Sequence, residues 1–420
     1  MATFSIEASD TDSFARLGRL RTLHGHISTP AFVPLASRGA VKGLLPAEVA
    51  SIGFQMVLGN TFHLMLSPGA ELIEQLGGLH SFIGWEGPII TDSGGFQVFS
   101  MGHGTVADEI KSRAPHRARA SSRGTVLAIE EQGVRFRSYI DGSQHRLTPE
   151  RSMQVQASLR SDIALAFDEC TPFHVSRDYT ARSMERTHRW LARCIDWHEA
   201  NAPKGQLLYG IVQGGVYQDL RRQSSALVAS SGCDGVAIGG SLGGCKEQMH
   251  QVVGYALSEL RTQAQLMPRH LLGIGEVDDL IACVQLGIDT FDCAMPTRLA
   301  RHGTALVADP QSRWRMDLLR AARRADRAPL LEGCPCHACS GRLSRAYLRH
   351  LVSAREINGV RLLTEHNLSF IAALMRCLRE AIASGCLPAV AAQLRGGANP
   401  HLVFSPTSSL SASADCSTFL

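Results

Sequence analysis

Short apolar segments recur along this chain, and each ends in a glycine or polar cluster that leads into a segment with helical periodicity. Continuous apolar strands that alternate with helices are typical of a parallel sheet buried on both faces. Eight such units favour an α/β fold of the (β/α)8 type, the TIM barrel. A doubly wound open sheet remains the alternative, because periodicity cannot show closure. The eight segments span residues 29–37, 53–61, 87–95, 161–170, 206–215, 234–244, 269–275 and 289–296.

Two segments interrupt this alternation. Residues 102–125 are polar and basic and follow the third predicted strand, so we expect a long surface insertion there. Residues 303–360 follow the eighth strand and are expected to form an appended zinc-binding subdomain. The barrel core is then expected over 1–302, and C-terminal helices over 361–396 should complete the barrel wall. The serine-rich tail over 397–420 lacks periodicity and is predicted to be disordered.

A cluster of cysteines marks the second interruption. Three thiolates with one distant imidazole suit a closed tetrahedral zinc site, whereas a catalytic zinc usually keeps one position open. The predicted zinc is therefore structural, and the chemistry should lie elsewhere. A cysteine-rich loop without metal is the alternative, and His337 and His350 are competing ligands. The predicted ligands are Cys334, Cys336, Cys339 and His366.

Composition excludes several classes of protein. With 45% hydrophobic and 19% charged residues the chain is typical of globular proteins. It shows neither a secretory leader nor an apolar run of the ~20 residues that a membrane span needs, so we expect a cytoplasmic protein with no membrane partner. Most of the twelve cysteines lie in apolar contexts and are expected to be reduced and buried.

The net charge of +4 is distributed unevenly. Between Arg298 and Arg349 there are eleven arginines against four acidic residues. Such a local excess can bind phosphate groups, although a solvated face would have the same composition.

Carboxylates stand where three of the predicted strands end. They are Asp92, Asp168 and Asp292, and in a barrel the carboxyl ends of the strands carry the functional side chains. Unpaired buried charge is costly, which argues against a core role, although the D-S-G-G sequence at Asp92 can also cap a helix. Three converging carboxylates can divide nucleophilic attack, proton transfer and substrate binding among them. Paired carboxylates are standard for substitution at an anomeric carbon.

Neighbouring residues suit a planar base. Gln213 and the backbone N–H groups of Gly239 and Gly240 can read a donor and acceptor edge, and Phe96 can stack on a ring face. The N–H donors of a guanine-like edge require an acceptor such as Asp168. From the residues alone we predict a glycosyl-transferring or hydrolysing barrel with a purine-like ligand.

Longer motifs resemble the tRNA-guanine transglycosylases, also called queuine tRNA-ribosyltransferases, of the bacterial type. The resemblance extends over about residues 15–390, and the motifs occur in the family's order. They are GNTFHLML (59–66), TDSGGFQVFS (91–100), SDIALAFDECTP (161–172), YGIVQGG (209–215), FDCAMPTR (291–298), the CPCHAC cluster, SRAYLRHL (344–351) and TEHN (364–367).

The resemblance implies a reaction and its residues. Guanine at the anticodon wobble position of tRNA would be exchanged for a 7-deazaguanine base, preQ1 or queuine-type, in queuosine modification. Asp292 would be the nucleophile that forms a covalent aspartyl-ribose intermediate. Asp92 would be the proton donor and acceptor, oriented by Asn60 and Gln97. The other implied substrate contacts are Ser93, Phe96, Asp168, Cys170, Gln213, Gly239, Gly240 and Leu272.

The resemblance also implies partners. Arg298 and Arg301 would hold the anticodon loop, and the zinc subdomain would contact the tRNA backbone and help to form a homodimer. Trp85, Tyr347 and His350 match positions that bacterial relatives use there.

The chain departs from the family pattern in the base pocket. After Gly240 bacterial enzymes usually read L-A-V-G-E, whereas this chain reads S-L-G-G-C over 241–245. The glutamate that helps to bind the aminomethyl group of the bacterial base is therefore missing. Leu272 stands where methionine is common, and Glu276 where a lysine often occurs. The catalytic assignment is unaffected, but the identity of the incoming base stays open.

Three other functions remain as alternatives. A non-catalytic tRNA-binding partner subunit would be expected to lack Asp92 or Asp292, and both are present. An archaeosine-type base-exchanging enzyme would usually carry an additional C-terminal RNA-binding domain. A zinc-dependent hydrolase would need an open ligand position, which four protein ligands do not leave.

Overall fold

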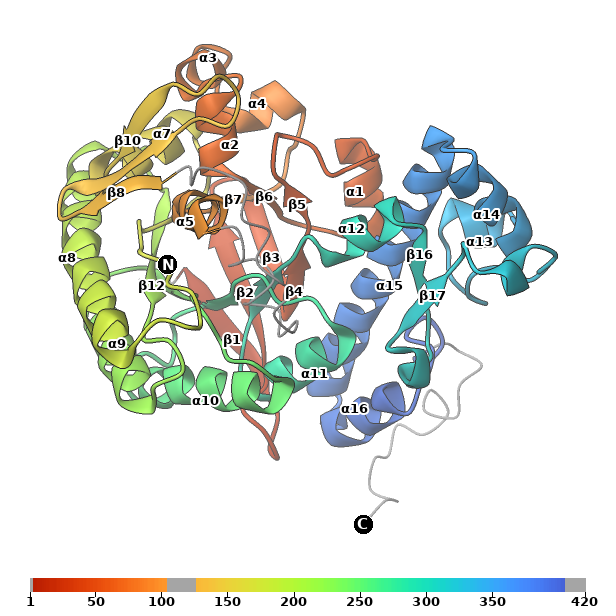
Figure 1. Ribbon diagram of the computed structural model, residues 1–420. Coiled ribbons are helices and arrows are strands. Elements are labelled where there is room, and N and C mark those ends of the chain that lie inside the picture. The colour runs from red at the N-terminus through yellow and green to blue at the C-terminus, as the bar shows by residue number, and fades with distance from the viewer. Residues whose placement is uncertain (1–2, 104–125, 405–420) are drawn as a thin grey trace.

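A computed structural model describes residues 3–103 and 126–404, which form a barrel with a smaller subdomain beside it (Figure 1). The parallel sheet has the strand order β4-β15-β14-β13-β12-β11-β7-β6-β5. β4 (Ala31–Val33) and β5 (Leu35–Ala36) are parts of one extended segment. This segment pairs with the last strand through β4 and with the second through β5. The sheet is thus a nearly closed barrel, interrupted at Pro34, which has no N–H to donate.

Each of the eight predicted strand segments contains a barrel strand. All neighbours in the sheet pair in parallel. The predicted (β/α)8 barrel is therefore confirmed, and the doubly wound open sheet is wrong, because the two edges of the sheet meet in one segment. The remaining barrel strands are β6 (Val57–Gly59), β7 (Ile89–Thr91), β11 (Ile163–Leu165), β12 (Leu207–Val212), β13 (Gly235–Ile238), β14 (Arg269–Leu271) and β15 (Thr290–Asp292).

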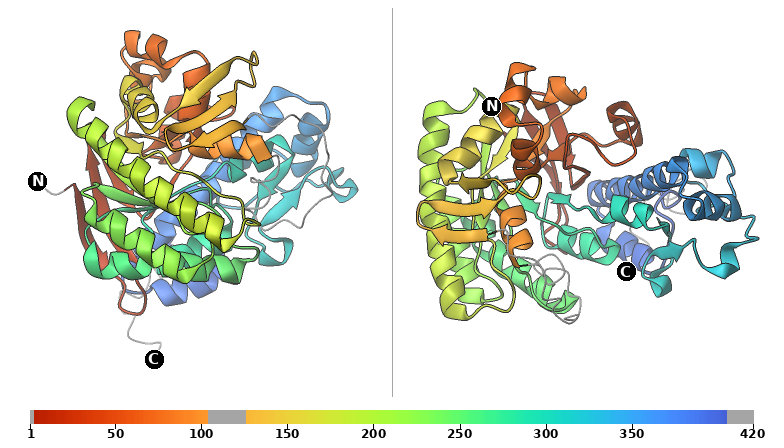
Figure 2. Two further views of the ribbon diagram at one scale, coloured as in Figure 1. Left: turned by 60° about the vertical axis from the view of Figure 1, so that its left-hand side comes forward. Right: turned by 45° about the horizontal axis from the view of Figure 1, so that its top comes forward.

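Helices connect the strands and cover the outside of the barrel. The longest of these connections is α8 (Arg177–Asn201), which lies beside α9 on the outer surface (Figure 2). Ser176 caps α8 by accepting a hydrogen bond from the N–H of Tyr179 at 3.2 Å, and Trp190 is buried beneath the helix. The other connecting helices are α1 (Pro46–Ile52), α2 (Thr61–Leu66), α3 (Ala70–Gln75), α4 (Leu79–Ile83), α5 (Gly95–His103), α7 (Pro149–Leu159), α9 (Gln218–Ser230), α10 (Lys246–Gln263), α11 (Val277–Gln285) and α12 (Met295–Arg301).

Two three-stranded antiparallel sheets in the described residues were not predicted from the sequence. The first consists of β1 (Phe4–Ser9), β2 (Arg16–Thr22) and β3 (Gly25–Thr29) and leads directly into β4. Its buried side chains Phe4, Leu20 and Ile27 share one cluster with inward-facing barrel residues, so this sheet closes the end at which the barrel strands begin.

The second antiparallel sheet follows α5 and consists of β8 (Val126–Glu130), β9 (Gly133–Arg137) and β10 (Gln144–Leu147). The insertion expected over 102–125 lies outside the described residues from position 104 onward. Only its first two positions are described, and they belong to α5.

The segment expected to form the appended subdomain folds beside the barrel wall. It contains β16 (Thr304–Leu306), η1 (Pro310–Ser312), β17 (Arg315–Asp317), η2 (Ala321–Arg323), α13 (His337–Ser340) and α14 (Arg345–Ser353). Helix α15 (Ile357–Ala383) runs between this group and the barrel (Figure 1). Leu363 packs in the subdomain cluster, whereas Phe370 packs in the barrel core. The division at residue 360 falls inside this helix and stays a prediction.

The chain ends, as far as it is described, in packed structure. Helix α16 (Leu387–Arg395) follows α15, and Val403 is buried. The disorder expected from residue 397 is therefore wrong for residues 397–404, and positions 405–420 lie outside the described residues. None of the described helices combines the length and apolarity needed to cross a bilayer.

Candidate active site

A pocket of about 310 Å³ opens where the barrel strands end. Sequence reasoning predicted ten of its lining residues, which now come together from distant parts of the chain. They are Asn60, Asp92, Ser93, Phe96, Gln97, Asp168, Cys170, Gly240, Leu272 and Asp292. Gln213 and Gly239 lie directly behind this lining, because Gln213 bonds Asp168 and a Cβ on Gly239 would lie 3.2 Å from Leu272.

Asp92 is held at the end of β7 by a set of amide donors. Its Oδ1 accepts the backbone N–H of Thr61 at 2.9 Å, and its Oδ2 accepts from Gln97 Nε2 at 3.0 Å and from Asn60 Nδ2. Asn60 also caps α2, since its Oδ1 accepts the N–H of His63, and this second bond fixes its amide. The side chain of Asp92 therefore has one orientation, towards the pocket.

The protonation of Asp92 is tuned to neutral pH. Burial raises its pKa to about 7, and the negative charge of Asp292 acts in the same direction, while hydrogen bonds from Thr61 and Gln97 oppose it. Near pH 7 both forms of this carboxyl group are populated. A group of this kind can give and take a proton without a large free-energy penalty in either direction.

Asp292 faces the same pocket from the end of β15. It is 7% exposed, and its Oδ1 accepts the backbone N–H of Gly273 at 3.1 Å. The two aspartates thus reach one cavity from strands on different sides of the barrel. Asp292 has fewer described hydrogen-bond donors than Asp92, which suits a group that must use an oxygen atom for attack.

Asp168 forms the third carboxylate of the pocket. Its Oδ1 accepts from Ser93 Oγ at 2.9 Å, and its Oδ2 accepts from Gln213 Nε2 at 2.7 Å. Burial raises its pKa to about 6, although these two hydrogen bonds act against the rise. The Oε1 of Gln213 is buried and has no hydrogen-bond partner in the described part of the chain. A ligand with several N–H donors would satisfy both groups.

Gly240 allows this close approach. Its φ of +75° is in the left-handed region, and a Cβ there would lie 2.2 Å from Gln213 Oε1, so no other residue fits without displacing the amide. Cys170 is buried beside it, and burial raises the pKa of its thiol far above the usual range. The thiol is therefore a neutral, weakly polar wall rather than a nucleophile.

The two predicted RNA-binding arginines lie at the rim, on α12. Arg298 lines a second cavity of about 440 Å³ that shares Gly273 and Cys293 with the pocket. Arg301 lies one turn further along the helix and is exposed. Arg315 of the appended subdomain also lines the second cavity, so the barrel mouth continues towards that subdomain.

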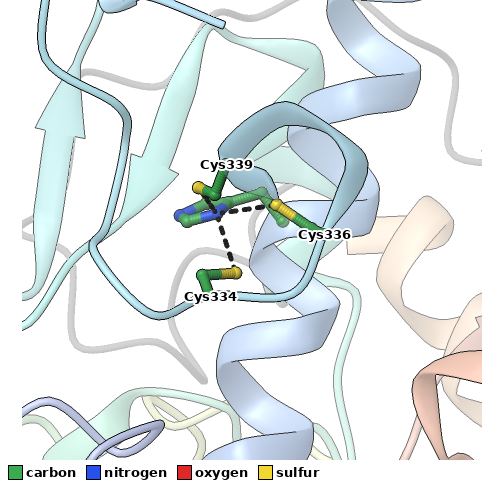
Figure 3. A group of neighbouring side chains, drawn as sticks. Cys334, Cys336 and Cys339 are labelled. Carbon is green, nitrogen blue, oxygen red and sulfur yellow. Dashed lines mark hydrogen bonds between the residues drawn. The ribbon is translucent and has the colours of Figure 1, made fainter. Parts of the chain in front are cut away.

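The predicted metal ligands converge on one point in the subdomain (Figure 3). The Sγ atoms of Cys334, Cys336 and Cys339 lie 3.6, 3.5 and 3.5 Å from Nδ1 of His366. A tetrahedral ion about 2.3 Å from sulfur and 2.0–2.1 Å from nitrogen requires a separation of about 3.5 Å. All four residues are buried, and together they can hold one metal ion.

A contact behind the histidine fixes its orientation. Nε2 of His366 lies 2.8 Å from the carbonyl oxygen of Leu306, to which it donates, and Nδ1 is thereby left to face the thiolates. The competing ligands are excluded. His337 is 77% exposed in its side chain and pairs with Glu365 at 2.7 Å, and His350 is exposed.

Comparison with known proteins identifies the family. A family model described as queuine tRNA-ribosyltransferase matches residues 10–397. The chain belongs to this family. A relative of the same name from Roseiflexus sp. (strain RS-1) is 51% identical over 391 residues, which cover 91% of this chain and 96% of the relative.

Further queuine tRNA-ribosyltransferases show the same extent of similarity. The protein from Pelotomaculum thermopropionicum is 45% identical over 384 residues, covering 91% of this chain and 95% of the relative. The protein from Herpetosiphon aurantiacus is 45% identical over 381 residues, covering 90% of this chain and 88% of the relative. The chain is therefore a pentosyltransferase that catalyses tRNA-guanine transglycosylation and acts on tRNA and a base. The predicted enzyme class is confirmed, and the three alternatives lose their support.

The residues of this transglycosylase that were matched to a dimer interface differ in exposure. Trp85 was predicted to contribute to a dimer interface, but it is only 5% exposed and its indole N–H donates to the carbonyl of Pro88 at 3.0 Å. Tyr347 is 48% exposed and, like His350, remains accessible on α14.

A second group of ionisable side chains escaped the sequence analysis. Asp162, immediately before β11, accepts hydrogen bonds from Nδ1 of His24 at 2.9 Å and Nε2 of His80 at 3.1 Å. It also accepts the N–H groups of His24 and Ile89. These are hydrogen-bond distances, shorter than the separations in the cysteine cluster, so we regard this group as structural rather than as a metal site. Burial alone would raise the pKa of Asp162, but the donors lower it to about 2.

The pocket also contains residues that sequence reasoning missed. His63 lines it within the GNTFHL motif, and burial, together with Arg38 and Lys42, lowers its pKa so that it is neutral near pH 7. Its position in a quoted motif was the available signal. Leu35 and Ser37 line the pocket from the first strand segment, which ends without a carboxylate and therefore gave no chemical signal.

Proposed function

We propose that the enzyme exchanges guanine at the anticodon wobble position for a 7-deazaguanine base through a covalent aspartyl-ribose intermediate, as a step of queuosine modification. The observation that carries this proposal is the pair Asp92 and Asp292, which face one pocket in different surroundings. One carboxyl group has a pKa of about 7 and is held by amides, and the other has an oxygen available for attack.

In the first step Asp292 attacks C1′ of the target ribose. The Oδ2–C1′ bond forms as the bond from C1′ to the guanine N9 breaks, and the electron pair of that bond stays on the base. Asp92, in its protonated form, donates its proton to the departing guanine. The products are neutral guanine, an ionised Asp92 and a tRNA esterified to Asp292.

In the second step the incoming base enters the same pocket. Asp92 removes the proton from its N9, N9 attacks C1′, and the carboxylate of Asp292 departs. Two inversions at one carbon give net retention, as in other double displacements at anomeric centres. The target nucleotide must leave its stack to reach the pocket, which costs least in a single-stranded loop.

The base is recognised by the groups behind the two aspartates. Asp168 accepts from the N–H donors of the guanine-type edge, and Cys170, Gln213 and Gly240 complete the reading of that edge. Ser93 and Gly239 support these residues. Phe96 and Leu272 form the two apolar walls between which the ring lies.

The remaining parts of the proposal concern partners. Arg298 and Arg301 hold the anticodon loop at the rim, and the buried cysteine cluster holds one structural zinc ion. Three thiolates and an imidazole are a donor set that zinc favours, and metal analysis of the purified protein tests this point. Tyr347 and His350 belong to a homodimer interface, and the enzyme acts in the cytoplasm.

Base exchange with labelled guanine tests the proposed function. Purified enzyme, unlabelled tRNA with guanosine at position 34 and labelled guanine should give labelled tRNA. A matched tRNA with adenosine at position 34 should stay unlabelled. The proposal fails if neither tRNA takes up label, or if both take it up equally.

A further inference from the structure

A buried histidine lies against the side chain of Asp292. His270, in β14, is completely buried, and its Nε2 lies 3.2 Å from Asp292 Oδ1. Its Nδ1 lies 2.9 Å from the hydroxyl oxygen of Thr290. The reaction as described above makes no use of this imidazole, so its place beside the nucleophile needs an explanation.

The register of the sheet places the histidine there. His270 pairs directly with Thr290 of the neighbouring strand β15. Thr290 and Asp292 are two residues apart, so their side chains point to the same face of the strand. His270 and the pocket residue Leu272 are related in the same way, which directs both into the barrel. The imidazole therefore lies inside the barrel, one level below the carboxylate.

The surroundings also select the tautomer. Nε2 has no aligned hydrogen-bond partner in the described residues, and the carboxylate oxygen at 3.2 Å is the acceptor that its contacts provide. A lone pair on Nε2 would face the negative oxygen and be repelled. The favourable arrangement has the hydroxyl of Thr290 donating to Nδ1 and a ring proton on Nε2, on the side of Asp292.

We propose that His270 is a positioning residue for the nucleophile and stabilises Asp292 when it leaves the ribose. This inference rests on the proposed role of Asp292 as nucleophile. Gly273 N–H donates to Oδ1 and His270 Nε2 lies 3.2 Å from the same oxygen, so Oδ2 is the oxygen left for attack. The histidine contacts neither the base nor the ribose and acts only through this carboxylate.

The effect is greatest in the second half of the reaction. In the ester Oδ2 is bonded to C1′ and Oδ1 is a carbonyl oxygen, which is a weaker acceptor than a carboxylate oxygen. When the incoming base displaces the ester, the electron pair of the C1′–Oδ2 bond returns to Asp292 and negative charge spreads to Oδ1. The attraction between the Nε2–H and Oδ1 then grows as that charge develops. His270 keeps its proton throughout, because the proton of the base goes to Asp92.

The test separates formation of the covalent adduct from its breakdown. The adduct of enzyme and tRNA is formed, free guanine is added in excess, and the surviving adduct is followed on a denaturing gel. His270→Phe removes the donor and keeps an aromatic ring, so breakdown should slow by about 10- to 100-fold. The dissociation constant for free guanine should change by less than about twofold, because the base edge is read elsewhere.

Partial rescue distinguishes a donor from a packing residue. His270→Gln supplies an amide N–H of similar reach and should recover breakdown to within about fivefold of the unmodified enzyme. Thr290→Val keeps the shape of the side chain but removes the hydroxyl that selects the tautomer of His270. The rate of adduct breakdown should therefore fall by about threefold. As a control, His198→Phe removes a histidine on the outer helix α8 and should leave both rates unchanged.

Several results would overturn the inference. An equal fall in the rate of adduct breakdown in His270→Phe and His270→Gln would mean that the residue serves packing alone. A breakdown rate that is unchanged in both variants would mean that the residue has no part in the reaction. If His270→Phe does not fold, as judged by its melting temperature, His270→Met takes its place as the apolar variant. Persistence of the adduct in Asp292→Asn would instead defeat the proposed function itself, so the two failures are distinguishable.

Discussion

Strand β11 has a buried aspartate at each end, and the two carboxylates are held in opposite ways. Asp162, before the strand, accepts four hydrogen bonds, and its pKa is lowered to about 2. Asp168, beyond the strand, accepts side-chain hydrogen bonds from Ser93 and Gln213, and its pKa is raised to about 6. Both are at most 5% exposed, so burial alone does not explain the difference.

The difference lies in how many donors the fold supplies. At the amino end of the barrel the protein satisfies its carboxylate completely, which fixes the antiparallel sheet and α4 against the strands. At the carboxyl end Asp168 has side-chain donors only from Ser93 and Gln213, and the Oε1 of Gln213 is buried without a hydrogen-bond partner among the described residues. Acceptors that the fold leaves open are available to a ligand, at a cost to stability that the fold must offset elsewhere.

Replacing Asp92, at the carboxyl end of the barrel, should have the strongest effect on activity. Asp92→Asn keeps the shape of the side chain but cannot transfer a proton. The rate of guanine exchange should fall by about 100- to 10,000-fold, the range that general acid–base groups contribute. Exchange of labelled guanine into tRNA measures it. Activity within tenfold of the unmodified enzyme would mean that another group moves the proton.

The matched change at the amino end should affect stability instead. Asp162→Asn replaces an acceptor of four hydrogen bonds by an amide that can accept through only one atom. The free energy of unfolding should fall by about 2–4 kcal/mol, while the folded variant keeps its exchange rate within about threefold. Denaturant unfolding and the exchange assay on one sample test both parts. A stable but inactive variant would break the comparison.

The pH dependence of stability should have opposite signs at the two ends. Burial raises the pKa of Asp92 to about 7, so its protonated form stabilises the fold at low pH and this contribution is lost as pH rises through 7. The Asp92→Asn side chain cannot ionise, so the variant does not lose this stability as pH rises. Its free energy of unfolding should exceed that of the unmodified enzyme by about 1–3 kcal/mol at pH 8, but not at pH 4. For Asp162, with its pKa lowered to about 2, the stabilisation is present above pH 4 and is lost below it.

Unfolding at pH 4, 6 and 8 provides the measurement for both residues. An unmodified enzyme that gains stability over Asp92→Asn between pH 6 and 8 would contradict the raised pKa. The Asp162→Asn variant serves as the internal control, since its deficit should stay constant across this range.

The smallest expected effect concerns the incoming base. Residues 241–245 provide no carboxylate for a cationic aminomethyl group, and the carboxylates that line the described pocket are Asp92, Asp168 and Asp292. The preference for preQ1 over guanine as the incoming base should therefore be smaller than in enzymes that carry the glutamate, by up to about tenfold. Competition of preQ1, queuine and guanine for exchange measures the preference. A strong preference for preQ1 would show that another acceptor replaces the glutamate.

The parallel barrel was predictable because each buried strand is a continuous apolar run. The pocket aspartates were predictable because they interrupt such runs at one end. β1 to β3 were missed, since a strand such as RLGRLRT contains three arginines and never forms an apolar run. Asp162 was missed because it precedes its strand instead of ending it. His270 was missed because periodicity gives the alternation within a strand but not which face points inward.

In the proposed reaction Asp292 forms a covalent bond to the ribose, while Asp92 only moves a proton. A denaturing gel of enzyme incubated with tRNA and a slowly reacting base analogue tests it most directly. The unmodified enzyme should show a protein–tRNA band, and Asp292→Asn should show none and should also lose base exchange. A persistent band in Asp292→Asn would contradict the account and make Asp92 the first candidate for the nucleophile.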